Sequence, residues 1–481
     1  MLKIKKLIAL VVLLGPTMVM AQGENAATAF SLQDCIDYAL QNAIDVQNAK
    51  LDEQSAEFKV KETVGIGLPQ VTGNVTVQKS PTQQRFFSTY NPPQPGEEQG
   101  FSFISEEDAQ SLGMEAGDVF AAQNFFQLKS NGNASLGVNQ LIFNGSYIVG
   151  LQASRAFKEL SIRQTSHIEG ERAATVAKAY FNVLINEDRL KLFSSNVDRL
   201  QVLYDNTVQM QKNGFAEQID VDRIRVSLNN IESEEENFKN LLNLSISLLK
   251  FQMNYPLDQP LELSGTIEDV LSMSVSNAEP VLDVDNRRDY QVLLANKRLQ
   301  ELNIKNKYAE ALPFISGFAT LGYSTQSGSF GGLFRTESDF NEVPGLGPDQ
   351  WYGYSVFGLR LGWNIFTGFQ RSYQIQQQKV ALAKMENSID EMENAINIEV
   401  EDASSTFSNA LEKLDVQREN MELAQRISNI TQIKFEEGVG SNLEVVDANN
   451  SLKEAQTNYY NALFEAVIAK IDLSRALGTT E

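Results

Sequence analysis

The sequence predicts a mainly α-helical fold with membrane β-strands, built as two copies of one plan in which a strand leads directly into a very long helix. In residues 358–369, apolar side chains alternate with glycine and polar ones, which is the period of a strand with one apolar face. After Gly368 the apolar spacing becomes helical and stays so for dozens of residues. Residues 136–145 show the same alternation and also lead into a long helical pattern.

The first 21 residues read as a signal peptide. Lys3, Lys5 and Lys6 precede an apolar run at residues 7–14, and Val19-Met20-Ala21 is a small-residue cleavage site. A membrane anchor is the alternative, but the run is shorter than the roughly 20 apolar residues that span a bilayer. We therefore expect an exported chain that begins at Gln22.

Charge and cysteine content exclude several classes. The formal net charge is −22, or −25 without the three lysines of residues 1–21, so nucleic acid is not an expected partner. Hydrophobic residues make up 42% of the chain, which argues against disorder. Cys35 is the sole cysteine, so no disulfide within the chain stabilises the fold, and we expect it on the apolar face of a helix.

The first repeat is predicted to occupy residues 22–254. We expect a helix over about 30–64, a strand over 68–77, a second strand ending at 143, a helix over about 147–212 and a returning helix to about 254. The segment Gln78–Asn133 between the two strands has no sustained period, and long loops of this kind are often functional. Residues 255–286, rich in Pro, Asp and Ser, are predicted to be a linker.

The second repeat is predicted to occupy residues 287–481. Its elements are a helix over about 289–311, a strand from 312 that echoes residues 68–73, a Gly/Ser-rich loop over 324–350, a strand over 354–366, a helix to about 435 and a last helix to 477. A shift of 224 residues brings Gly438 onto Gly214 and aligns the apolar positions of both helical hairpins. Alanine at many seam positions of a heptad pattern predicts close-packed antiparallel coiled coils.

Four amphipathic strands per chain indicate an oligomeric membrane barrel. Lipid cannot satisfy an open sheet edge, and single-chain barrels begin at eight strands, so several copies must close one barrel. Two copies would give a filled eight-stranded barrel, whereas three or four would leave a pore lined by Arg360 and Asn364. A soluble β-sandwich is the alternative, and the long helices between the strands argue against it.

Catalytic motifs are not apparent in the sequence. His167 is the only histidine, which excludes a two-histidine metal site within one chain, and we expect it on the surface of a helix. The sequence also lacks a Gly-rich phosphate loop. We therefore expect neither an enzyme nor a cofactor, and the numerous carboxylates are mostly expected on solvated helix faces.

Several motifs together resemble the TolC-type outer membrane efflux protein family. They are the two Leu-Pro-x-[Val/Ile]-x-Gly strand starts, the Phe-x-Gly strand ends, and the Gly-x-x-x-x-[Leu/Ile]-[Glu/Asp]-Val turns, of which residues 438–448 are the most specific. The chain departs from the family at Ala43-Ile44 and at residues 286–289, both near helix starts. The resemblance implies a homotrimer whose twelve-stranded β-barrel in the outer membrane continues as an α-barrel in the periplasm.

The resemblance also implies functional residues at the helix tips. It places Asp220, Glu444 and Asp447 at a periplasmic constriction, and Arg223 occupies the first-repeat position of Asp447. The helix tips expected to contact a periplasmic adaptor comprise Gly214, Phe215, Ala216, Gly438, Val439, Gly440 and Ser441. An alternative for Glu444 is an ordinary acid in the first turn of a helix, which the helix dipole favours.

The function implied by the resemblance is a passive outer membrane exit duct that works with a periplasmic adaptor and an inner-membrane pump. An outlet for type I protein secretion would have the same architecture. A third possibility, from another class, is a structural or adhesion protein that exposes Gln78–Asn133. The sequence names neither the cargo nor the role of that segment.

Overall fold

The computed structural model describes residues 29–92, 103–122, 124, 127–267, 284–334, 338–339 and 350–479. The expected signal peptide, residues 1–21, lies outside them, as does half of the predicted linker. The described residues form two compact units. The sheet unit comprises Ala49–Thr165 and Arg288–Asn394, and the helical unit comprises the remaining described residues. Each unit contains parts of both sequence repeats, so the domain boundaries proposed along the chain stay a prediction.

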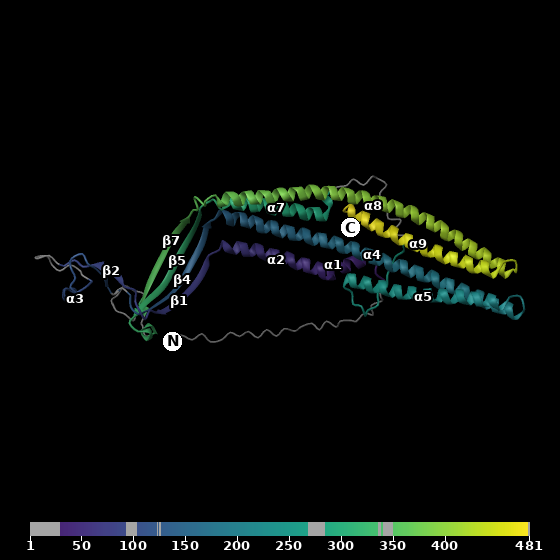
Figure 1. The fold of residues 1–481 in the computed structure, drawn as a ribbon, viewed down its shortest axis with the longest axis horizontal. Helices are drawn as coiled ribbons and strands as arrows, with labels where there is room; N and C mark the ends of the chain where they lie inside the picture. Colours follow the sequence, from purple (N-terminus) through teal and green to yellow (C-terminus); the bar gives the residue numbers. More distant parts are fainter. Residues whose placement is uncertain are drawn as a thin grey trace, which may run out of the picture. The chain divides into compact units, whose positions relative to one another are not determined.

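The sheet unit contains an antiparallel sheet whose neighbouring strands β1, β4, β5 and β7 lie side by side (Figure 1). The strands are β1 (Gln70–Lys79), β4 (Ser130–Phe143), β5 (Phe314–Ser327) and β7 (Trp351–Gly362), with the two-residue β6 (Ser338–Asp339) pairing in parallel with the start of β7. The first two come from the first repeat and the next two from the second. These are the four strands per chain that the sequence predicts.

Helices continue from these strands within the same unit. They are most of α2 (Ile44–Ile66), the start of α4 (Gly145–Lys212), α7 (Arg288–Ala309) and the start of α8 (Gln370–Glu436). The Thr165 hydroxyl donates to the Ala49 carbonyl at 3.2 Å and joins α4 to α2. Lys297 pairs with Glu386 at 3.3 Å and joins α7 to α8.

Strand β7 ends at Gly362, so the predicted extension of this strand to residue 366 is wrong. The last ladder pair is Phe314 with Gly362, and a Cβ at residue 362 would overlap the Phe314 ring. The Trp363 indole then donates to the Ala311 carbonyl at 3.0 Å, which takes the chain out of the ladder. Strand β5 also reaches further than expected, to Ser327.

The segment between β1 and β4 is not without secondary structure, in contrast to the prediction. It contains β2 (Phe86–Thr89), α3 (Glu106–Ser111) and β3 (Val119–Ala122). β2 and β3 pair in antiparallel fashion, and the Phe86 and Phe103 rings meet edge to face, with their centroids 4.8 Å apart. A short 3₁₀ helix, η2 (Phe330–Phe334), follows β5.

The helical unit contains the long hairpins. In it the long helices α4 and α8 run beside α5 (Gln218–Met253) and α9 (Asn442–Ala476) (Figure 1). Helix α9 contacts α4, α5 and α8. The other elements of the unit are α1 (Leu32–Asn42) and η1 (Val284–Asn286). One buried apolar cluster lies around Cys35, Tyr180 and Ala466, and a second lies nearer the hairpin tips around Phe193 and Leu228.

The predicted helix over residues 30–64 is in fact two helices. Ser31 and Asp34 form a capping box at the start of α1, which ends at Asn42. Ala43 then takes an extended conformation, with ψ of 135°, before α2 begins at Ile44. The break falls at the Ala43-Ile44 position where the sequence departs from the family pattern.

Candidate functional site: helix tips, interhelical seam and a two-faced sheet

The two hairpin tips have the same backbone geometry. Gly214 and Gly438 have φ of 81° and 73°, a left-handed conformation in which glycine is favoured. Phe215 N–H donates to the Met210 carbonyl at 2.9 Å, and Val439 N–H makes the same bond, also at 2.9 Å, 224 positions later. The turns therefore end α4 and α8 in the same way, as the internal repeat requires.

Each tip also presents an apolar side chain to solvent. Phe215 is 80% exposed and Val439 is 78% exposed. Ser441 accepts a hydrogen bond from Glu444 N–H at 3.2 Å and so caps α9. Ala216 and Gly440 are half-buried beside these exposed residues. The predicted adaptor-contacting residues thus include two exposed apolar side chains, one at each tip.

The predicted gate residues lie in the first turns of α5 and α9. Asp220 accepts a hydrogen bond from Glu217 N–H at 3.1 Å. Glu444, Arg223 and Asp447 are exposed, and among the described residues neither Arg223 nor Asp447 forms an ion pair. The single chain therefore does not bring the expected Arg223–Asp447 pair together, and a pair between chains stays a prediction.

The contacts that do join the two tips were missed from the sequence. Asn442, which is buried, donates to the Asp220 carbonyl at 2.7 Å, and Lys453 pairs with Glu234 at 3.1 Å. The Oδ1 atom of Asn442 is buried without a hydrogen-bond partner. The available signal was a polar residue directly after the capping Ser441, at a position that faces the other hairpin.

A seam of polar pairs joins α4 of the first repeat to α9 of the second. From the middle of the unit toward the tips, the pairs are Glu171–Arg475 at 3.3 Å, Lys178–Asp472 at 2.5 Å, Arg189–Asn461 at 2.9 Å and Asn196–Gln456 at 2.7 Å. Residue numbers rise along α4 as they fall along α9, so the two helices are antiparallel. We call this set of pairs the α4–α9 seam.

Arg189 is the most buried cation of the seam. Its guanidinium lies 5.3 Å from the centre of the Phe238 ring and 5.6 Å from that of Tyr460. Burial lowers the pKa of Arg189, although the arginine remains charged. Cation–π contacts and one hydrogen bond, which the guanidinium donates to the Asn461 side-chain oxygen, stabilise this charge.

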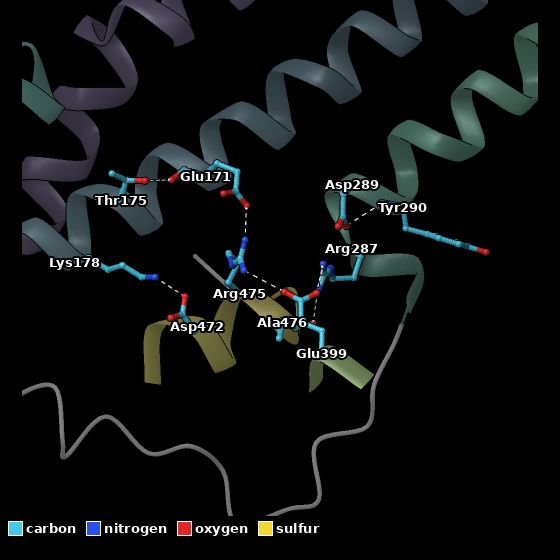
Figure 2. A network of polar contacts seen from close by, with 10 residues as sticks. All are labelled: Glu171, Thr175, Lys178, Arg287, Asp289, Tyr290, Glu399, Asp472, Arg475 and Ala476. Atoms are coloured by element: carbon cyan, nitrogen blue, oxygen red, sulfur yellow. Dashed lines mark hydrogen bonds and ion pairs between the residues drawn. The ribbon is translucent and has the colours of Figure 1, made fainter. Parts of the chain in front are cut away.

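Arg475 of the seam and Arg287 form a cluster of ion pairs at the end of the α4–α9 seam that lies away from the tips (Figure 2). Arg287 donates to the Ala476 carbonyl at 2.8 Å and to Glu399 at 2.9 Å. Arg475 donates to the other oxygen of Glu399 at 3.2 Å as well as to Glu171. Glu399 thus holds two arginines at the wall of an open groove of about 810 Å³ between α8 and α9.

The sheet has one apolar and one polar face. The register places Val75, Leu136, Leu321, Phe357 and Leu359 on one face, where all are exposed in the single chain. The opposite face carries mainly Thr, Asn, Ser and Gly, including Thr72, Gly137 and Thr320 opposite one another.

The two residues predicted to line a pore lie at the end of the sheet where the helices begin. Arg360 lies on the polar face, with its guanidinium 5.8 Å from the centre of the Phe318 ring. Asn364 follows the end of β7 and lines a pocket of about 400 Å³. Its carbonyl accepts a hydrogen bond from Arg371 at 3.2 Å. Their role in a pore stays a prediction.

The described residues do not contain a cluster of three or more potential metal ligands. Within the same part of the chain, none of the helices is long and apolar enough to cross a membrane. The arrangement contains a polar sheet face and hairpin tips that carry exposed apolar and charged side chains.

Comparisons with known proteins agree with this geometry. Residues 284–479 match the family described as outer membrane efflux protein. The outer membrane protein TolC of Escherichia coli K12 is 22% identical over 358 residues, covering 72% of this chain and 69% of TolC.

Solved structures of outer membrane channels share the fold. The outer membrane protein VceC of Vibrio cholerae superposes with a TM-score of 0.66 at 14% identity, covering 93% of this chain and 96% of VceC. The open state of the Neisseria gonorrhoeae channel MtrE gives 0.63 at 18% identity, covering 93% and 88%. The predicted fold class and the resemblance stated from the sequence are confirmed.

Proposed function

Taking the chain as a TolC-type outer membrane efflux protein, which its motifs, its family match and its fold support, we propose that it forms the passive exit duct of a tripartite efflux system. The outer membrane holds the sheet, and the helices extend into the periplasm. A periplasmic adaptor and an inner-membrane pump complete the path, and the pump supplies the energy. The chain itself acts as a conduit and not as an enzyme.

The two-faced sheet is the observation that carries this proposal. Large apolar side chains such as Phe357 and Leu359 are exposed on one face, as expected of a surface that meets lipid. The edge strand β1 is exposed along its whole length, and an open edge cannot persist in lipid. Three copies of the four long strands close a twelve-stranded barrel, in which β1 of one copy pairs with β7 of the next.

The polar face then lines the duct. Thr72, Thr320 and Arg360 lie on that face, and in the closed barrel they meet water. Asn364 lies where the duct continues into the helices. A wide polar passage of this kind suits cargo that crosses without chemical change.

The hairpin tips dock the adaptor and form the gate. Phe215 and Val439, exposed on turns of identical geometry, supply apolar anchors for the adaptor. Asp220, Glu444 and Asp447 of three chains form an acidic constriction, which favours cations over anions.

Arg223 pairs with Asp447 of a neighbouring hairpin and holds the tips closed. One exposed ion pair contributes only about 0–1 kcal/mol to the closed state. The three symmetric copies of the pair act together.

Two measurements test the duct and its docking separately. The purified protein in planar bilayers is expected to conduct ions, and a chain that assembles in the bilayer without conducting would contradict the duct. In cells, Phe215→Asp with Val439→Asp is expected to lower efflux of a fluorescent dye while the conductance of the purified variant stays unchanged. The control is Lys212→Asp, an exposed charge change close to the first tip.

The proposed pair between Arg223 and Asp447 of a neighbouring hairpin, which we call the latch, is tested separately. Arg223→Ala or Asp447→Ala is expected to raise the open fraction in the same recordings. An open fraction equal to that of the unaltered protein in both variants would reject the latch, and the duct would stand.

A further inference from the structure

The apolar face of the sheet changes character at the end that lies away from the helices (Figure 1). Side chains alternate between the two faces along each strand, so the face that carries Leu136 and Leu321 carries Ser130, Thr325 and Ser327 at this end. All three of these hydroxyl-bearing residues are buried. Another part of the chain therefore covers this end of the apolar face.

The cover is the 3₁₀ helix η2, which follows β5. The Trp351 indole, at the start of β7, donates to the Leu333 carbonyl of η2 at 3.1 Å. The Trp351 ring lies on the face in question, because a Cβ at Gly132 would come within 2.9 Å of that ring and of Thr325 Cγ2. Leu333 itself is buried. The helix η2 is thus fixed to the outward face of the sheet.

In place of the covered hydroxyls, η2 presents two phenylalanines to the surroundings. Phe330 is 44% exposed and Phe334 is 69% exposed, and their rings meet edge to face with the centroids 5.6 Å apart. Residues 314–334 do not include a charged side chain. Exposed aromatic rings on an uncharged surface are typical of the boundary between membrane and water.

The position of η2 along the sheet matches the thickness of a membrane. At the helix end of the sheet, Ile315 pairs with Leu361, and the exposed Trp363 and Phe366 follow. Thr325 lies ten positions after Ile315 on β5. At about 3.3 Å per residue this is roughly 33 Å along the strand. A tilt of about 40° reduces it to a height of about 25 Å, which is that of the apolar band of a membrane barrel.

We propose that η2 is an interfacial anchor whose Phe330 and Phe334 enter the outer leaflet of the outer membrane, where acyl chains meet head groups. The anchor rests on the outer membrane sheet of the proposed function and adds the residues that hold its outer end. Lipid is the occupant because η2 continues the apolar face that meets lipid in the proposed duct. Trp351 keeps η2 against the sheet, so the two rings stay at one depth.

Spin labels on single cysteines test the depth of the two rings, in a Cys35→Ala background and in vesicles of phosphatidylcholine and phosphatidylglycerol. Labels on Phe334→Cys and, independently, on Phe330→Cys are expected to relax strongly with oxygen, which enters lipid, and several-fold less with a water-soluble nickel chelate. Phe357→Cys, on the apolar face of the sheet, is the control for lipid. Glu107→Cys, on the exposed side of α3, is the control for water.

The two controls separate the failures. If the labels of η2 respond to the nickel chelate as Glu107→Cys does, while Phe357→Cys stays in lipid, the anchor is overturned and the duct stands. If Phe357→Cys also responds as Glu107→Cys does, the sheet does not face lipid, and both the anchor and the proposed function fail.

A further variant tests the residue that positions η2. Trp351→Phe keeps a ring beside Gly132 but removes the N–H group that holds Leu333. The label on Phe334→Cys is then expected to become more mobile, with a narrower resonance line, whereas the label on Phe357→Cys is expected to keep its line shape. An unchanged line at residue 334 would overturn the role of Trp351 in holding the anchor.

Discussion

Asn196 of α4 donates a hydrogen bond from Nδ2 to Oε1 of Gln456 of α9 at 2.7 Å, and both side chains are buried. This contact joins the two sequence repeats inside the helical unit. The pair is shielded from solvent, where an unsatisfied amide is costly. It therefore fixes the register between α4 and α9 rather than only adding to their stability.

Removing one partner of this pair is expected to destabilise the protein more than removing both. Gln456→Leu leaves the Asn196 amide buried without its partner and should cost about 1–3 kcal/mol. The double variant Asn196→Leu with Gln456→Leu should recover most of that loss, apart from the hydrogen bond that Arg199 donates to Asn196 at 3.0 Å. Thermal unfolding followed by circular dichroism measures both, and a double variant less stable than Gln456→Leu would contradict the argument.

The sheet faces make a second prediction about neighbouring residues of β5. Leu321→Arg places a charge on the apolar face, at a cost of about 2–4 kcal/mol near mid-membrane. Thr320→Arg, at the same depth, places it on the polar face, opposite Gly137 of β4. We expect much less assembled Leu321→Arg protein than Thr320→Arg protein in the outer membrane fraction, and the reverse ranking would show that the facing is wrong.

The acidic constriction makes a third prediction. Asp220→Asn with Glu444→Gln removes two charges per chain, while the asparagine can still accept the hydrogen bond from Glu217 N–H. The reversal potential in a salt gradient is expected to move toward zero, and block by multivalent cations is expected to weaken. Glu437→Gln, an exposed acid just before the second turn, is the control. Unchanged selectivity in the double variant would leave these acids as ordinary helix-start residues.

Cys35 makes a fourth prediction, about pH. Burial, with a smaller effect of the Asp34 charge, raises the pKa of the Cys35 thiol from 9.0 to about 12. The folded chain therefore keeps the proton between pH 9 and 12 while the unfolded chain loses it, so this thiol contributes stability below pH 9 that falls as the pH rises toward 12. Alkylation by iodoacetamide at pH 9 should be far slower in native protein than in urea. Equal rates would show that the thiol is accessible.

Local signals were sufficient for several parts of this fold. Gly214 and Gly438 end the long helices because a left-handed turn favours glycine, and the constant shift between them revealed the duplication. Strand alternation gave the apolar face around Leu359 correctly. The end of β7 was not predictable, because it depends on the indole of Trp363 reaching the Ala311 carbonyl, a contact between residues distant in sequence.

In the candidate site, too, the local features were predictable from the sequence and the contacts between distant residues were not. The acids and apolar residues of the tips follow from helix starts and turns, which are local. Their partners do not: Asn442 meets the Asp220 carbonyl, and Lys453 meets Glu234, only because two hairpins distant in sequence pack side by side.

The sequence by itself determined the duplication, the helix and strand periods, the tip turns and the family resemblance, because each depends on residues close in the chain or on a constant shift. Only the tertiary structure decided which helices pair. Packing α4 against α9 gave the buried side chains of Arg189 and Asn196 hydrogen-bond partners within the chain, Asn461 and Gln456. It left apolar side chains of α5 and α8, such as Val226 and Leu423, exposed in the single chain.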